Sequence, residues 1–119
     1  MEKEVFIVSA LRTPIGEFGG ALKSIDPLDL AVSVMKAAID QSGIPKDRIG
    51  KVILGNTLAP LKPNIARGAA ITCGIPPEVP SFSVHCACAS AMQAIISGAS
   101  ALMLGEGETA LVGGVDPNS

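Results

Sequence analysis

The feature that most constrains this chain is a run from Val79 to Gly105 that contains no Asp, Glu, Lys or Arg. Residues 88–104 of this run predict a helix in which nearly every position is apolar or small. Such a helix has almost no polar face and must be covered on all sides. A membrane span normally has about 20 mostly apolar residues. Here polar residues and a glycine interrupt the run, which predicts a helix buried in a protein instead. The interrupting residues are Ser90, Gln93, Ser97, Gly98 and Ser100.

Short apolar runs alternate with helical repeats along the whole chain. The β-rich runs predict strands at residues 5–10, 51–54, 82–84 and 109–112. Apolar residues at helical spacing predict helices after Asp26, at residues 65–72 and at residues 88–104. In the first of these helices Asp26 is the expected N-cap and Pro27 the first residue, and Gly43 and Pro45 end it.

The order of these elements, β-α-β-α-β-α-β, predicts an α/β fold with parallel strand pairs and right-handed crossovers. Four strands and two other helices can cover one side of the helix at 88–104. We therefore expect its other side to be covered by polypeptide that this chain does not contain.

Composition limits the class of protein. The 119 residues suit one domain, and 48% hydrophobic with 17% charged residues indicate a packed core rather than disorder. The net charge is −2 and basic residues do not cluster, so we expect neither nucleic acid nor a membrane as a partner. The N-terminus lacks the features of a secretory signal, and three cysteines without framework spacing predict a reducing, cytoplasmic environment.

Cys88 is the candidate for chemistry, because it falls where a predicted strand turns into a predicted helix. Unpaired N–H groups and the dipole at a helix N-terminus favour a thiolate and can also donate to an oxyanion. The residues alone leave two other interpretations open. Cys88 could be a small buried apolar residue, or His85, Cys86 and Cys88 could be metal ligands, although structural zinc sites use other spacings and four ligands. Cys73 and Cys86 are expected to be structural.

Four segments, in order, resemble the thiolase family. VFIVSALRTPIGEFGGAL is similar to its N-terminal strand and R-T-P-x-G-x-F-G-G loop, and PNIARGAAITCGIP carries Arg67 at the family's usual arginine. SVHCACASAMQAI is similar to the nucleophile motif V-N-x-x-C-x-S-G, and ALVGGVDPNS is similar to a strand that ends in Gly-Gly. The nucleophile motif aligns Val84, His85, Cys88, Ser90 and Ala91.

The resemblance implies that residues 1–119 are the N-terminal part of a thiolase N-terminal domain, with the loop domain and the C-terminal half absent. It implies one incomplete half of the thiolase fold, a sheet with flanking helices and a buried helix that bears the nucleophile. Cys88 would take an acyl group from acyl-coenzyme A, for Claisen condensation or for cleavage of 3-ketoacyl-CoA, and its N–H would help to stabilise the oxyanion. Coenzyme A thioesters would be substrates, and no cofactor or metal is expected. Substrate-binding residues are not assigned.

Three positions depart from the family pattern: His85 replaces Asn, Ala91 replaces Gly, and Pro117 is unusual in its segment. The family's catalytic His and second acid/base Cys have no counterpart here. We therefore expect an acyltransferase that is inactive as this isolated chain and active in a homo- or hetero-oligomer with a complementing chain. The alternatives are a non-catalytic assembly subunit and a ketosynthase-like acyltransferase, because ACASA is also similar to ketosynthases.

Overall fold

Three parallel strands form the centre of the fold in the computed structural model, which describes residues 3–57 and 63–117. The strands are β1 (Lys51–Gly55), β2 (Ser81–Val84) and β3 (Ala110–Gly114), in the order β2-β1-β3. The central strand pairs Ile53 with Phe82 on one side and with Val112 on the other. The parallel α/β architecture is therefore confirmed, and Gly55, Val84 and Gly114 end their strands at one edge of the sheet.

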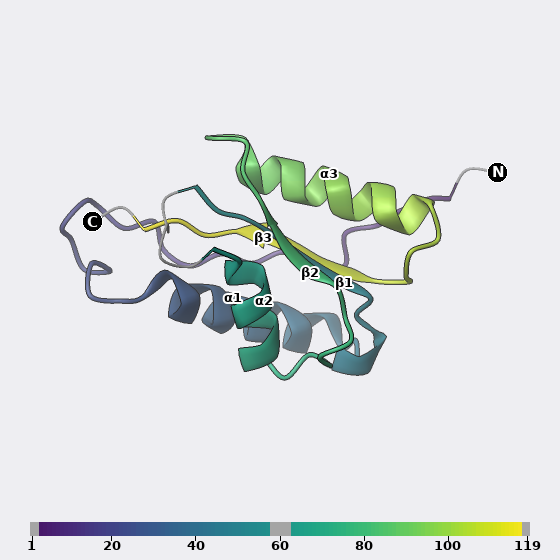
Figure 1. Cartoon of the computed structure of the whole chain (residues 1–119). Helices are drawn as coiled ribbons and strands as arrows, with labels where there is room; N and C mark the ends of the chain where they lie inside the picture. Colours follow the sequence, from purple (N-terminus) through teal and green to yellow (C-terminus); the bar gives the residue numbers. More distant parts are fainter. Residues whose placement is uncertain (1–2, 58–62, 118–119) are drawn as a thin grey trace.

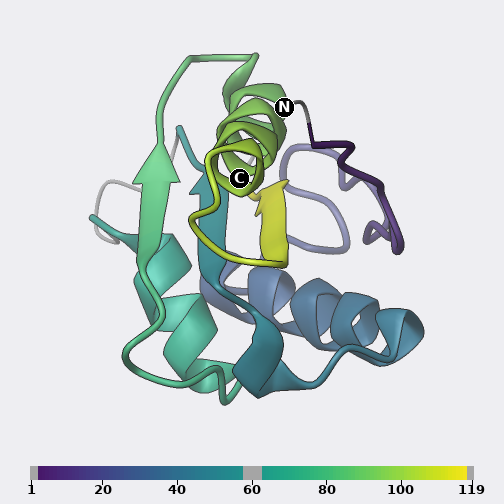
Figure 2. The ribbon, with the colours of Figure 1, turned by 90° about the vertical axis from the view of Figure 1, so that its right-hand side faces the viewer.

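Helices cover both faces of this sheet, as Figures 1 and 2 show. α1 (Pro27–Ser42) and α2 (Ile65–Thr72) lie on one face, and α3 (Ser90–Met103) crosses the other. A short 3-10 helix, η1 (Lys46–Arg48), leads from α1 into β1. No helix within the described ranges combines the length and the hydropathy that crossing a membrane requires.

The ends of α1 follow the sequence prediction. The Asp26 carboxylate accepts the Leu28 N–H at 2.8 Å, and Pro27 is the first helical residue. Gly43 adopts φ 71°, the left-handed conformation that glycine permits, and donates its N–H to the carbonyls of Ile39 and Asp40. Residues at 65–72 likewise form the predicted helix, α2.

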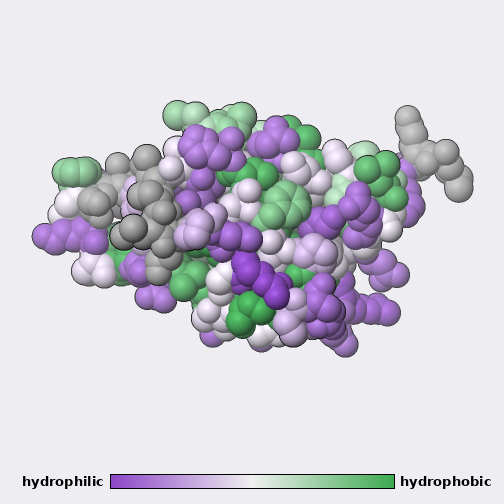
Figure 3. Space-filling view, in the orientation of Figure 1, coloured by the Kyte–Doolittle hydropathy of each residue, from purple (hydrophilic) through white to green (hydrophobic). Residues whose placement is uncertain are grey.

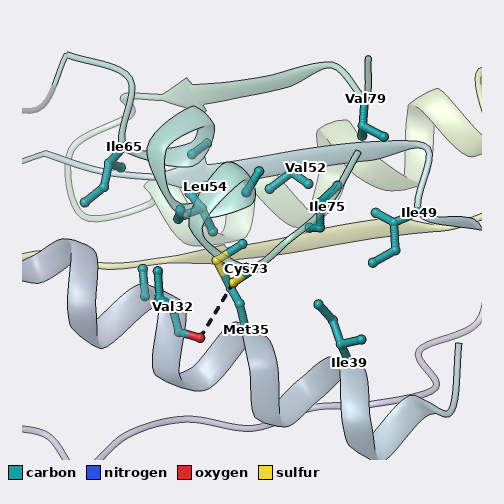
Figure 4. Packing of buried hydrophobic residues seen from close by; sticks show 14 residues of the cluster. Val32, Met35, Ile39, Ile49, Val52, Leu54, Ile65, Cys73, Ile75 and Val79 are labelled. Atoms are coloured by element: carbon teal, nitrogen blue, oxygen red, sulfur yellow. Dashed lines mark hydrogen bonds between the residues drawn. The ribbon is translucent and has the colours of Figure 1, made fainter. Parts of the chain in front are cut away.

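The main hydrophobic core lies between the sheet and the α1 and α2 layer (Figure 4). Val52 and Leu54 of β1 contribute to it, whereas Ile53, on the same strand, points to the opposite face by strand alternation. All three side chains are buried, so the central strand is covered on both faces. The remaining members come mainly from the helices and their connections and include Val32, Met35, Ile39, Ile49, Ile65, Cys73, Ile75 and Val79.

α3 is buried on one face only, as expected for the side that this chain can cover, and its outer side is exposed. Its buried positions are the small residues that face the sheet, Ser90, Ala94, Gly98 and Ala101. Its larger apolar side chains point away from the sheet and are exposed, among them Met92, Ile95, Ile96 and Met103. Hydrophobic atoms accordingly emerge along the top of the molecule in Figure 3, where Figure 1 places α3. The helix also begins at Ser90 rather than at residue 88.

The predicted strand at residues 5–10 is wrong for the described chain. The segment is not paired with the sheet, and Phe6, Ile7 and Val8 are exposed. It is tied instead to α1, since Ser9 Oγ lies 2.9 Å from the Ala38 carbonyl oxygen and 2.8 Å from Gln41 Oε1. A strand requires a neighbouring backbone, and β-rich composition alone does not supply one. The sheet therefore has three strands among the described residues instead of the expected four.

Candidate active site

Cys88 lies in the turn that joins β2 to α3, and its thiol is free and exposed. The predicted junction of strand, turn and helix is therefore confirmed as geometry. Cys88 stands two residues before Ser90, the first residue of α3. Cys86, also exposed, falls in the same turn after the end of β2.

The turn contains an alanine in the left-handed region. Ala87 has φ 47°, and among the described residues it is the one non-glycine with a positive φ. The Ala89 N–H closes the turn on the Cys86 carbonyl at 3.0 Å. A left-handed residue with a Cβ costs about 1–2 kcal/mol and persists only where its surroundings hold it.

Ser90 holds the turn from its helical side. Its hydroxyl accepts the Cys86 N–H at 2.8 Å and donates to the Ala87 carbonyl at 2.7 Å. Its own N–H donates to the same carbonyl at 3.1 Å. Ser90 is 4% exposed, so these bonds are shielded from competing water.

The ends of β1 and β3 add a second set of polar contacts beside the turn. The Thr57 hydroxyl lies 3.2 Å from the Ala87 carbonyl oxygen and 3.2 Å from Ser90 Oγ. The Asp116 carboxylate accepts the Thr57 N–H at 2.6 Å and the Asn56 side-chain N–H at 3.3 Å. Neither Thr57 nor Asp116 is among the site residues predicted from the sequence. Both follow the ends of predicted parallel strands, a position that could have marked them as neighbours.

Two glycines let α3 begin directly above the sheet edge. A Cβ on Gly55 would lie 2.4 Å from the Ser90 carbonyl carbon, and a Cβ on Gly114 would lie 2.7 Å from the Ala91 Cβ. Side chains at these positions would push the first turn of α3 away. The helix start, and the turn that carries Cys88, therefore rest on bare backbone.

The first turn of α3 can receive negative charge beside Cys88. Its N-cap is Ala89, whose side chain makes no capping hydrogen bond. The Ser90 N–H already bonds the Ala87 carbonyl, but the N–H groups that follow it in the first turn have no side-chain cap and can face an anion, and the helix dipole adds to the attraction. This arrangement can stabilise a developing oxyanion.

The other candidate residues do not gather into a second centre. His85 is exposed, and its Nδ1 accepts the Ala87 N–H at 3.4 Å. Cys73 is buried, with its Sγ 3.7 Å from the Val32 carbonyl oxygen, and burial raises the pKa of its thiol (Figure 4). Within the described ranges, no three His, Cys, Asp or Glu side chains lie together as metal ligands would.

Arg67 supports the chain that leads into β2. Its guanidinium donates to the carbonyls of Val79 at 3.0 Å and Pro77 at 2.6 Å. A groove of about 280 Å³ lies elsewhere, between α3 and β2, and Cys88 is not part of its lining. The Lys51–Glu106 ion pair, at 2.7 Å, lies at this groove. Neither feature brings a substrate pocket to the thiol.

Comparison with known families gives one consistent result. The sequence profile described as "Thiolase, N-terminal domain" matches residues 5–119. The acetyl-CoA acetyltransferase of Cupriavidus necator is 39% identical over 93% of this chain and 28% of its own length. The β-ketoadipyl-CoA thiolase of Pseudomonas aeruginosa is 39% identical over the whole chain and 30% of its own length.

Solved structures agree in fold. The acetyl-CoA acetyltransferase of Bacillus anthracis superposes with a TM-score of 0.86 at 40% identity, over 91% of this chain and 28% of that one. The Acat5 thiolase of Ascaris suum, solved with coenzyme A, gives 0.84 at 42% identity, over 88% and 28%. The chain thus spans less than a third of the length of the relatives it matches.

Proposed function

This chain belongs to the thiolase family as an N-terminal segment, and we propose that it is the nucleophile-bearing part of an acyl-CoA C-acyltransferase. One observation carries the proposal. An exposed cysteine, at the position of the family's nucleophile motif, sits on a strained turn immediately before a helix that lacks a side-chain cap.

In the proposed reaction, the Cys88 thiolate attacks the carbonyl carbon of an acyl-CoA thioester. A bond forms between Sγ and that carbon, the carbon–sulfur bond to coenzyme A breaks, and the coenzyme A thiolate leaves and takes up a proton. The acyl group then passes to the carbanion of a second acyl-CoA, or, in the reverse direction, cleavage of a 3-ketoacyl-CoA forms the same acyl-enzyme. Covalent catalysis divides one carbon–carbon bond step into two easier transfers.

The chain's own groups would act at the oxyanion and at the sulfur. The Cys88 N–H and the first turn of α3 are the proposed donors to the oxyanion. Ser90 and the turn hold the thiol in place, and His85 receives no catalytic role. Two relatives were solved with coenzyme A, which supports acyl-CoA as the substrate. No cofactor beyond these thioesters is proposed, and the proposed compartment is the cytoplasm.

We also propose that acyl transfer needs polypeptide in addition to residues 1–119. The relatives are more than three times as long as the matched segment, and the exposed apolar face of α3 is suited to burial against further chain. That polypeptide could belong to the same protein or to an oligomeric partner. It would provide the acid/base groups that remove and deliver protons.

The test is acylation of this chain in a protein or complex that also contains the further polypeptide proposed above. Incubation with acetyl-CoA, followed by peptide mass spectrometry, should place the acetyl group on Cys88. Cys88→Ala should abolish acyl transfer, whereas the matched Cys86→Ala variant, in the same turn, should retain it. Equal acylation of Cys86 and Cys88, or full transfer by Cys88→Ala, would contradict the proposal.

A second candidate function is a non-catalytic assembly subunit. It is favoured by the exposed apolar side chains of α3, namely Met92, Ile96 and Met103. The same variant separates the two functions. If Cys88→Ala leaves assembly intact and removes acyl transfer, the enzyme is supported. If both are unchanged, the assembly role is supported.

A further inference from the structure

The turn that carries Cys88 is held by the sheet as well as by α3. Among the described residues, the Ala87 carbonyl oxygen has three polar neighbours: the Ser90 N–H at 3.1 Å, Ser90 Oγ at 2.7 Å and Thr57 Oγ1 at 3.2 Å. The two Ser90 groups belong to the helix that the turn begins. Thr57 follows the central strand β1 and so connects the turn to the rigid part of the fold.

Thr57 is itself fixed in place. Its N–H donates to Asp116 Oδ1 at 2.6 Å, a charge-assisted bond. Asn56 Nδ2 donates to the same oxygen at 3.3 Å and to the Val115 carbonyl at 2.7 Å. The residues after β1 and after β3 are therefore joined, and the Thr57 hydroxyl is presented to the turn from a defined position.

The turn needs such support because of Ala87. At φ 47° a residue with a Cβ is strained, and a strained turn relaxes when its surroundings allow it. Relaxation at Ala87 would move the next residue, Cys88, relative to the first turn of α3. The position of the thiol relative to the start of α3 would then change.

We propose that Thr57 is a positioning residue for Cys88 and that Asp116 acts through Thr57. The inference rests on the proposed function, in which Cys88 is the nucleophile. Thr57 touches neither substrate nor thiol in this role. Its hydroxyl holds the Ala87 carbonyl, and through it the conformation that presents Cys88.

This positioning is measured as the rate at which iodoacetamide alkylates Cys88 in the full chain. Peptide mass spectrometry distinguishes Cys88 from the other cysteines. Thr57→Val keeps the shape of the side chain and removes the hydroxyl. It should slow the labelling of Cys88 about three- to tenfold, the range that one net hydrogen bond implies. Thr57→Ser should restore the rate to within about twofold of the unsubstituted chain, because the hydroxyl returns.

Thr72→Val is the matched control. The Thr72 hydroxyl also bonds a carbonyl, that of Gly68 at 2.8 Å, but it lies on α2 and not beside the turn. Its loss should leave Cys88 labelling unchanged. Thermal melting of each variant verifies folding, and Thr57→Ala, judged by the same criterion, replaces Thr57→Val if the latter does not fold. A rate for the hydroxyl-free variant equal to that of the unsubstituted chain overturns the proposal.

A double variant tests the part played by Asp116. Asp116→Ala should slow labelling of Cys88, and combining it with Thr57→Val should add little further slowing, because both changes remove the same support. Additive slowing would overturn the statement that Asp116 acts through Thr57.

Two labelling results distinguish failure of the proposed function from failure of the positioning role. If iodoacetamide labels Cys86 as fast as Cys88 in the unsubstituted chain, the proposed function loses its support. If Cys88 is labelled selectively and the hydroxyl-free variant matches it, only the positioning role fails.

Discussion

Ala87 determines the geometry of the site, because its backbone adopts the left-handed conformation, which costs free energy for alanine. Its carbonyl is the acceptor that Ser90 and Thr57 share. The strain is local and compensated by these contacts. It is therefore open to direct measurement by substitution.

Ala87→Gly should leave the free energy of unfolding within about 0.5 kcal/mol of the unsubstituted chain, or raise it. Glycine removes the left-handed penalty, and the gain offsets its larger entropy in the unfolded state. Ala99→Gly is the control, since Ala99 lies inside α3, and it should lower stability by about 1 kcal/mol. Denaturant unfolding measures both, and equal losses in the two variants would contradict the assigned strain.

Cys73 gives the folded state a pH dependence at high pH. Burial raises the pKa of its thiol and outweighs the attraction of Lys36 and Lys46, which lowers it. The folded chain thus keeps the proton after the unfolded chain has lost it. The contribution of this group to stability is fully present below pH ~8.5, the ordinary value for cysteine, and is lost as the pH rises toward the raised pKa.

Denaturant unfolding between pH 7 and 10 measures this effect. The unsubstituted chain should lose stability more steeply with pH than Cys73→Ala, which has no thiol at that position. The variant will also be less stable at pH 7, because it leaves a cavity, so the slopes and not the absolute values are compared. Equal slopes would show that Cys73 does not contribute.

At this scale the sequence predicted Cys88 and its turn but not Thr57 or Asp116. A cysteine between a β-rich run and a helical run has a strong local pattern. Thr57 and Asp116 have none, because their role depends on which strand ends meet, and they are 59 positions apart in the chain. Only the strand order β2-β1-β3 brings them together.

Among the elements, α3 has the tightest fit, since its first turn lies against the backbone at the ends of β1 and β3. The helix and its approximate bounds follow from the sequence, and so does the exposure of one side in this chain, because the other predicted elements can cover only one side. The division of α3 into a buried face of small residues and an exposed face of larger apolar residues was not predicted, because it depends on which side of the helix lies against the glycines of β1 and β3.

Gly55→Ala should destabilise the fold by about 1–3 kcal/mol, as overpacking does in a core that cannot yield. Its Cβ would lie 2.4 Å from backbone that cannot rotate away. Gly68→Ala is the matched control. There the nearest atom is Leu28 Cδ1 at 3.4 Å, and α2 should gain up to about 1 kcal/mol from alanine. Thermal unfolding of the two variants should shift in opposite directions, and a shared direction would contradict the packing assigned here.

The segment at 5–10 shows the limit of element prediction from composition. VFIVSA has the residues of a buried strand, and Val5 and Ser9 are in fact half-buried. Its partner, however, is α1, reached through the hydroxyl of Ser9. Whether a β-rich run pairs with a sheet depends on the backbone that lies beside it in the fold. A short stretch of sequence does not contain that information.

At the scale of the whole molecule, the apolar side chains are buried on one side of the sheet and partly exposed on the other. The core between the sheet and the α1 and α2 layer is closed. The outer face of α3 exposes half or more of Met92, Ile96 and Met103. Apolar area of this kind is worth about 25 cal/mol per Å² when it is buried.

We therefore expect the chain to associate, with itself or with a complementing chain, through α3. Sedimentation velocity should detect association of the full 119-residue chain, and Ile96→Gln should weaken it. Ile71→Gln is the control, because Ile71 is exposed to a similar degree, 47% against 50%, but lies on α2. A stable monomer, or equal weakening by both variants, would contradict the role of α3.

The contact between Ala91 and Gly114 also couples mutations at the two positions. The methyl of Ala91 already occupies the space into which a side chain at 114 would grow, 2.7 Å from the nearest such atom. An alanine at residue 114 is therefore expected to be more harmful in the present chain than after Ala91→Gly, which removes the 2.7 Å contact and leaves the Cα of residue 91 as the nearest atom, at 3.3 Å. The residue present at 91 thus decides how well a mutation at 114 is tolerated.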